Sequence, residues 1–204
     1  FCAATLAMDA PPLPAYANGG PLPKRGEDDP RSLGEALKKN SAAFPDRGLR
    51  LYDAGDDIDG PGRLLSFQAL ASQASGLAGA LRRKGLSSGS AAILQIVSLE
   101  SHFKTWWACV LAGVLPLTIA VPATYARPSS SSDKVCNVWR LLQGPPLLAN
   151  EVSALGLQEL GRREALLGLR IWPVEEQLLL GGGASPSGAG AGSAAPAPSP
   201  GGGG

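Results

Sequence analysis

The stretch TWWACVLAGVLPLTIAVPATYA, residues 105–126, contains no charged side chain and decides how the chain is interpreted. It is long enough to cross a bilayer as one helix. Such a helix would have to continue through Gly113, Pro116 and Pro122, although an interior proline costs a helix about 3 kcal/mol and a glycine about 1 kcal/mol. We therefore expect no membrane span here, and predict two consecutive elements of a soluble core instead.

The first of these elements is a helix that Ser98 or Ser101 caps and Gly113 ends. The second is a buried strand over 114–121 that Pro122 closes. The buried face of the helix is expected to contain Phe103, Trp107, Val110 and Leu111.

Elements of the same two kinds alternate on both sides of this stretch. Before it, a helix is predicted by apolar residues at helical spacing: Phe67, Leu70, Ala74, Leu77 and Leu81. Gly85 fits the left-handed position after that helix. The run AAILQIV (91–97) then predicts a strand that is covered on both faces. After it, the pattern predicts a helix over 132–144 with Val135, Val138, Trp139 and Leu142 inward, a strand over 146–149, a helix from Glu151 with a break near Gly161, and a strand over 169–174. This alternation predicts an α/β fold, a Rossmann-like layered sheet that is mostly parallel and has flanking helices.

The amino-terminal part adds a short helix and a hairpin. Ser32 and Glu35 form an S-x-x-E capping box, which opens a helix with Leu33, Ala36 and Leu37 inward, and Phe44-Pro45-Asp46 ends it. LRLYD (49–53) and RLLSF (63–67) flank the loop AGDDIDGPG and predict a β-hairpin.

Composition divides the chain into three parts. Residues 1–30 are rich in proline and glycine and predict an extended lead-in, residues 31–180 are the folded candidate, and residues 181–204, which contain only Gly, Ala, Ser and Pro, predict a disordered tail. Because the first residue is Phe1, we expect the sequence to begin inside a longer reading frame.

Charge and cysteine content exclude several classes of function. The net charge of +1, from 18 basic and 17 acidic residues, gives no reason to expect nucleic acid as a partner. The three cysteines, Cys2, Cys109 and Cys136, are far apart and form no C-x-x-C pair, so we expect neither a zinc site nor a disulfide framework. We expect a reducing, cytoplasmic location instead. His102 is the one histidine, which excludes multi-histidine metal sites.

Each candidate site has a plainer structural interpretation. The acidic loop fails the EF-hand pattern, because Gly55 and Ser66 stand where the first and last carboxylate ligands belong. SSGS (87–90) is a helix-to-strand turn, and GAGAGS (188–193) is low-complexity sequence without a preceding strand or following helix.

The remaining candidates are single side chains or helix-end clusters. His102 is interpreted as a surface or capping residue, Cys109 as a small buried apolar side chain, and RRK (82–84) as a cluster that complements the helix dipole. Trp106 and Trp107 are interpreted as apolar packing anchors. We assign no catalytic, cofactor-binding or metal-binding residue in this chain.

The order of segments resembles the amino-terminal part of the adenylate-forming (AMP-binding) ligase superfamily. The matching stretches are SLGEALKKNSAAFPDRGLRLYD, LSFQALASQASGLAGALRRKGL, AAILQIVSLESHFKTWWACVLAGVLPLTIAVPATY and SSDKVCNVWRLLQGPPLLAN. The lead-in GGPLP and the run from VPATYARP to KVCNVWRLL look most like adenylation domains of peptide and polyketide assembly lines and fatty acyl-AMP ligases.

The resemblance implies a complete parent enzyme that activates a carboxylic acid with ATP and magnesium and then passes the acyl group to a thiol, often phosphopantetheine on a carrier domain. In the family, a Gly/Ser/Thr-rich loop with a lysine follows the strand that corresponds to LRIWPV, whereas here GGGASPSGAGAGSAAPAPSPGGGG follows. We therefore expect an incomplete adenylating ligase that is inactive as it stands and whose partner is the remainder of the parent synthetase. A non-catalytic α/β interaction module and a protein anchored in the membrane through 105–126 are the alternatives.

Overall fold

The structure is a computed structural model, and it describes residues 26, 28–52 and 55–174. The expected tail over 181–204, with its GAGAGS run, and nearly all of the lead-in over 1–30 lie outside these residues, as do Cys2 and Asp53.

Helices and strands alternate along the described chain in the predicted order. The elements are α1 (Leu33–Ala43), β1 (Gly48–Leu51), β2 (Arg63–Ser66), α2 (Phe67–Arg83), β3 (Ala91–Gln95), α3 (Leu99–Ala112), β4 (Leu115–Thr118), α4 (Ser130–Leu141), β5 (Leu147–Ala149), α5 (Glu151–Arg163) and β6 (Ile171–Pro173). The α/β fold class is therefore confirmed.

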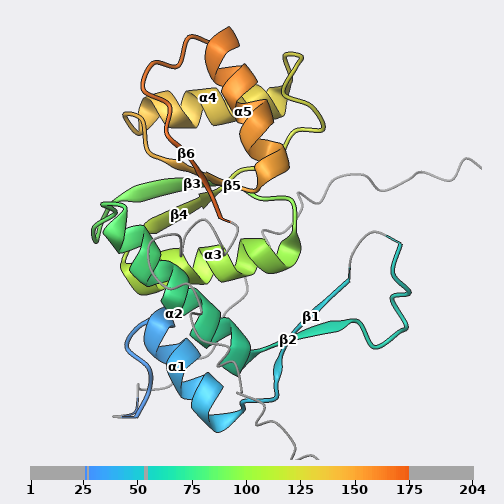
Figure 1. The fold of residues 1–204 in the computed structure, drawn as a ribbon. Helices are drawn as coiled ribbons and strands as arrows, with labels where there is room; N and C mark the ends of the chain where they lie inside the picture. The colour runs from blue at the N-terminus through green and yellow to red at the C-terminus, as the bar shows by residue number, and fades with distance from the viewer. Residues whose placement is uncertain (1–25, 27, 53–54, 175–204) are drawn as a thin grey trace, which may run out of the picture.

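Four of the strands form one parallel sheet in the order β4-β3-β5-β6. Helices α2 and α3 cover one face of this sheet, and α4 and α5 cover the other (Figure 1). β3 is buried on both faces, as its apolar run predicts, because it lies between two strands and two helical layers. The core is thus a three-layer arrangement with β3 in its middle layer.

A smaller apolar cluster joins the amino-terminal elements to the layers. Leu37 of α1, Leu51 of β1, Leu65 of β2 and Leu70 of α2 are buried together, and Phe103, Trp107 and Leu111 of α3 pack against them. β1 and β2 form the predicted antiparallel hairpin. Helix α3 therefore has two buried sides, one toward the sheet and one toward this cluster.

The uncharged stretch 105–126 folds as two elements, as predicted. Ser98 caps α3, and Gly113 ends it with a φ of +77°. The next residue, Val114, donates its backbone N–H to Cys109 O. A left-handed residue at this position favours glycine, because other side chains are strained there. No helix in the described part of the chain combines the length and hydropathy needed to cross a membrane.

Strand β4 differs from its prediction as a buried strand. It forms hydrogen bonds only with β3, which makes it an edge strand within the described residues, and Leu115 is 60% exposed. Pro116 is compatible with such an edge, since proline cannot donate to a second neighbour. The apolar pattern correctly predicted a strand, but it could not show whether a second strand lies beside it.

Three helix boundaries and buried faces also differ. Helix α5 runs without a break through Gly161, where Leu169 packs so closely that a Cβ would lie 2.6 Å from Leu169 Cδ2. Helix α4 begins earlier than predicted, at Ser130 after the cap Ser129. The main sheet-facing residues of α3 are small, Ala108, Cys109 and Ala112, while the predicted large residues face the amino-terminal cluster or are half-buried.

Two leucines predicted to point inward are exposed, Leu33 at 57% and Leu142 at 37%. Each lies at a helix end. The first half of the capping box is confirmed, since Ser32 Oγ accepts from Glu35 N at 3.1 Å. The second half is wrong by one residue, because the Glu35 carboxylate accepts from Arg31 N instead of Ser32 N.

Candidate functional site

The carboxyl edge of the parallel sheet is the place where this fold can build a site. β3, β4, β5 and β6 all end at this edge, and α3 and α5 begin directly after β3 and β5 on opposite faces. In open parallel sheets, ligands bind outside the carboxyl ends of the strands where the strand order reverses. Here the reversal falls between β3 and β5, so the side chains that surround this point define the candidate site.

Gln95, the last residue of β3, is fully buried in this edge. Its amide nitrogen donates to Ile119 O at 2.7 Å and to Leu94 O at 3.1 Å. Its amide oxygen accepts from the Tyr125 hydroxyl at 2.9 Å. A buried polar side chain needs such partners, because leaving one unpaired costs about 1–3 kcal/mol. Gln95 therefore holds the segment after β4 across the end of β3.

Tyr125 connects this segment to α5. Its ring is packed so closely on Gly156 that a Cβ there would lie 2.2 Å from Tyr125 Cδ2. Its carbonyl accepts from Arg163 Nη1 at 2.6 Å. Burial raises the pKa of Tyr125 to about 12, with a side-chain hydrogen bond to Ser153 acting in the opposite direction. The phenol is thus neutral across the physiological range and acts as a hydrogen-bond donor.

The two helix starts at this edge differ in their caps. Ser98 Oγ accepts from Ser101 N at 3.4 Å and closes the first turn of α3. Asn150 stands at the cap position of α5 without a side-chain cap hydrogen bond, and its Oδ1 is buried without a partner among the described residues. The polar groups of Gln95 and Tyr125 are satisfied within the protein, so they position chain segments and do not face a substrate.

His102 lies partly exposed at the molecular surface, and its side chain also contacts a neighbouring strand. It is half-buried in the first turn of α3, and its Nε2 lies 3.3 Å from Thr118 Oγ1 at the end of β4. Burial lowers the pKa of His102, which favours the neutral imidazole. The side chain therefore bridges a helix and an edge strand.

Cys109 is buried with no exposed surface, as predicted, and burial raises its pKa to about 12. Cys136 is also free and buried. A thiol with a raised pKa is a poor nucleophile at neutral pH. Neither cysteine is a candidate for covalent chemistry.

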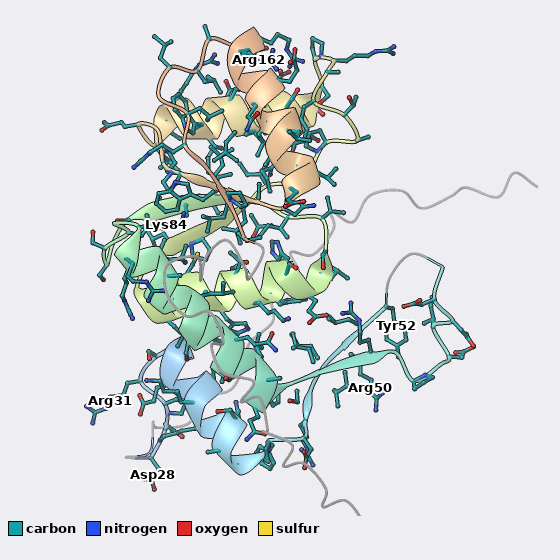
Figure 2. All side chains as sticks on the ribbon, in the orientation of Figure 1. Asp28, Arg31, Arg50, Tyr52, Lys84 and Arg162 are labelled. Carbon is teal, nitrogen blue, oxygen red and sulfur yellow. The ribbon has the colours of Figure 1, made fainter. Side chains whose placement is uncertain are left out.

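The RRK cluster at the end of α2 contacts neighbouring elements. Arg82 donates to Leu111 O, a terminal carbonyl of α3. Lys84 Nζ lies 5.6 Å from the centroid of the Trp172 ring on β6 (Figure 2). Trp106 and Trp107 meet edge to face at 5.2 Å and are partly buried, which agrees with a packing role.

The two loops that invited a ligand interpretation are turns. Ser87 and Ser90 hydroxyls lie 3.1 Å apart before β3, at the amino edge of the sheet and away from the candidate site. In the acidic loop, Gly60 N donates to Asp57 O, and the Tyr52 hydroxyl donates to Gly60 O at 3.1 Å (Figure 2). Among residues 26, 28–52 and 55–174, no group of three or more His, Cys, Asp or Glu side chains could hold a metal ion.

Sequence reasoning missed the residues that organise this edge. Gln95 is the one polar residue inside AAILQIV, and a polar residue in a strand buried on both faces signals a specific partner. Tyr125 gives no comparable signal, because it follows the strand in an irregular segment. Only the folded structure brings it back to β3.

No protein-family model matches the sequence, but many solved structures share its fold. The McyG A-PCP structure complexed with phenylalanyl-adenylate is 27% identical, with a TM-score of 0.67, over 77% of this chain and 27% of that one. A multidomain structure of a keto acid-selecting NRPS module, with adenylation, ketoreductase and pseudo-Asub parts, is 25% identical, with a TM-score of 0.61, over 72% of this chain and 12% of that one.

A structure from work on fatty acyl-adenylate ligases from E. coli and L. pneumophila has a TM-score of 0.59 at 20% identity, over 72% of this chain and 25% of that one. This last similarity concerns the fold alone. In each case the chain spans about a quarter or less of the length of the neighbour that it matches. The described part of the chain therefore has the fold of the corresponding part of these adenylation domains.

Proposed function

We propose that residues 31–180 form the amino-terminal α/β layer of an ATP-dependent enzyme that converts a carboxylic acid into its acyl-adenylate. The observation that carries this proposal is the 27% identity to the McyG A-PCP structure over 77% of this chain. That neighbour is complexed with phenylalanyl-adenylate, and others are bound to keto acyl adenylate. A fatty acid, an amino acid or a related acid is the substrate class of the parent enzyme in this proposal.

The role of the segment within the parent is structural. Gln95 and Tyr125 use their polar groups to tie β3, the segment after β4 and α5 into one connected surface. Such a surface can support the parts of an enzyme that bind ATP and the acid, while its own residues do not contact the reacting atoms. The partners are then the remainder of the synthetase and a carrier domain with phosphopantetheine, in a cytoplasmic setting.

ATP and Mg²⁺ belong to the complete enzyme in this proposal. Catalysis of adenylation requires charge stabilisation at the phosphates by a lysine, a metal ion and backbone donors. The described residues do not fit these groups, since the carboxyl edge supplies no metal ligand set and the polar atoms of Gln95 and Tyr125 are paired internally. We therefore assign no step of adenylation to them and propose that this chain alone is inactive.

Acid-dependent exchange of labelled pyrophosphate into ATP tests the inactivity. The purified 204-residue chain is incubated with ATP, Mg²⁺ and panels of amino, keto and fatty acids, beside a complete adenylation domain as the positive control. We expect no exchange above the sample without protein. Exchange that depends on one acid would show that this chain contains a working site.

The family role is tested separately by reading the coding sequence downstream of residue 180. A Gly/Ser/Thr-rich stretch that ends in Gly-Lys within some tens of codons would support a parent ligase. A stop codon there, together with a stable and monomeric protein, would favour a non-catalytic α/β interaction module instead.

A further inference from the structure

A groove lies where α5 ends and the chain turns toward β6. It has a volume of about 600 Å³, and Leu166, Leu169 and Ile171 contribute its apolar lining. Leu167 also lines it and is 88% exposed, and Arg162 is the charged residue in its wall. We refer to the groove that these five residues line as the α5 groove. It lies at the amino edge of the sheet, since the segment after α5 leads into the start of β6, so its role is independent of the proposed function.

The surface around the α5 groove has an excess of positive charge. Residues 139–146 and 158–171 carry four arginines and two glutamates. Arg140 is half-exposed and donates from Nη2 to a backbone carbonyl at the end of α5. Arg162 is paired with Glu159 at 2.6 Å but is 76% exposed, and a guanidinium has donors left for further acceptors. The groove therefore favours a ligand that combines an apolar side chain with carboxylates.

The loop between β1 and β2 carries the complementary chemistry. Residues 55–62 contain three aspartates and no basic side chain. Ile58 stands between Asp57 and Asp59 and is 80% exposed. Asp57 holds the loop as a turn, because its Oδ1 accepts from Asp59 N at 3.0 Å and its carbonyl accepts from Gly60 N at 3.0 Å. The turn thus presents one large apolar side chain among carboxylates, and burial of that side chain against an apolar surface is favourable.

This loop cannot reach the α5 groove of its own chain. Figure 1 shows β1 and β2 extending away from the layers, on another side of the molecule from the end of α5. In Figure 2, Tyr52 beside the loop and Arg162 at the end of α5 are well separated. An ion pair between Arg63 of β2 and Glu100 of α3 fixes the base of the hairpin. The two complementary surfaces can therefore meet only between two copies of the chain.

We propose that residues 55–62 of one copy dock in the α5 groove of a second copy, with Ile58 against Leu167 and Leu169 and with Asp59 beside Arg162. Such a contact joins two different surfaces, so every pair of copies leaves one loop and one groove free. The assembly grows head to tail into a ring or a filament and does not stop at a symmetric dimer. Exposed charge pairs are weak and are screened by salt, so the association is reversible and sensitive to ionic strength.

Sedimentation velocity of the full chain tests this contact. All samples carry Leu155→Lys, so that the exposed apolar side chain on α5 does not contribute. The protein is measured from about 10 µM to about 300 µM, at about 50 mM and about 500 mM salt. At low salt we expect the average mass to rise past that of a dimer as the concentration increases. At high salt it should fall toward the mass of the monomer, because screening weakens exposed charge pairs.

Ile58→Ser and Leu167→Ser each remove one of the two surfaces. Both side chains are largely exposed, so the variants should keep the fold, which thermal melts check. Each variant alone should associate roughly tenfold more weakly. An equimolar mixture should form a dimer and stop there, because the intact loop of one variant fits the intact groove of the other. Val152→Ser is the matched control, since Val152 is 77% exposed on α5 outside the groove, and it should leave the association unchanged.

A charge exchange tests the polar part of the contact. Arg162→Glu should weaken the association at low salt, because it places a carboxylate opposite Asp59. Adding Asp59→Lys to the same chain should restore it, since the two charges then attract again. If the double variant associates no better than Arg162→Glu alone, the proposed pairing of these two residues is wrong.

A chain that stays monomeric up to about 300 µM would overturn the proposal. A mixture of Ile58→Ser and Leu167→Ser that does not dimerise would also overturn it, as would an effect of Val152→Ser equal to theirs. Vesicles of phosphatidylserine and phosphatidylcholine supply the remaining comparison. A monomer that sediments with these vesicles through Leu167 but not through Ile58 would assign the α5 groove to an anionic membrane surface and reject the contact between copies.

Discussion

The hydrogen bond between Tyr125 and Gln95 offers the most direct test of how the carboxyl edge is held together. In Tyr125→Phe the ring remains and only the hydroxyl is lost. The Gln95 amide oxygen, on a side chain with no exposed surface, then loses its donor at 2.9 Å. Leaving a buried acceptor unpaired costs about 1–3 kcal/mol. We expect a loss of that size in the free energy of unfolding.

Urea unfolding followed by far-UV circular dichroism measures this loss. For a domain of roughly 150 residues, 1 kcal/mol corresponds to about 4 °C in Tm, so the variant should melt about 4–12 °C below the parent chain. Tyr52→Phe is the matched control. Its hydroxyl donates to Gly60 O in a partly buried hydrogen bond beside a mostly exposed loop, so its removal should cost no more than about 1 kcal/mol.

The pH dependence of stability supplies a second measurement on the same variant. Because burial raises the pKa of Tyr125 to about 12, the unfolded chain releases the phenolic proton first, near pH 10. The stabilisation is therefore complete below pH 10 and is lost as the pH rises toward 12. Tyr125→Phe should weaken this alkaline decline. A change below about 0.5 kcal/mol at neutral pH, with an unaltered alkaline decline, would refute the role that we assign to Tyr125.

Close packing, burial and exposure lead to three further predictions. Gly156→Ala should destabilise the fold by about 1–3 kcal/mol in urea unfolding, because the new Cβ would lie 2.2 Å from the Tyr125 ring. The control Gly76→Ala has open space around the new Cβ and should stabilise the fold by about 0.5–1 kcal/mol. Equal effects of the two substitutions would contradict the close packing at Gly156. Burial raises the pKa of Cys109 to about 12 from an ordinary 9.0, so the thiol's contribution to stability is complete below pH 9 and declines above it. In thermal melts, Cys109→Ala should therefore lose less Tm than the parent chain as the pH rises above 9. Leu155 is 69% exposed on α5, so the isolated chain should self-associate as its concentration rises, which light scattering measures as an increasing particle mass. Leu155→Lys should reduce this self-association. A parent chain that stays monodisperse would count against the idea that another part of a synthetase covers this surface.

The fold was predictable from sequence where local signals and the layered arrangement agree. Gly113 and Pro116 interrupt the uncharged stretch, and the structure divides it at that point. The apolar pattern of β3 also indicated its central place in the sheet, because a strand that is apolar on both faces must be covered twice.

Predictions failed where they depended on neighbours that the local pattern does not contain. The pattern of β4 does not reveal that it lies at an edge, and the glycine at 161 marks a close contact with Leu169 where a helix break was expected. The candidate site was the least predictable part. Gln95 is separated along the chain from Tyr125, and no spacing rule joins a strand residue to an irregular segment beyond the next strand.

The central place of β3 has a consequence for how this chain matures during synthesis. The pairing of Ala91 with Leu115 joins neighbours along the chain through α3, whereas the pairing of Ile93 with Leu147 must wait for α4 and β5. Loop closure costs more entropy as the loop lengthens. A nascent chain on the ribosome can therefore close the β3–α3–β4 unit while one flank of β3 still lacks its neighbour. Until Leu147 emerges, that flank exposes unpaired backbone groups, which can pair with another chain and favour aggregation.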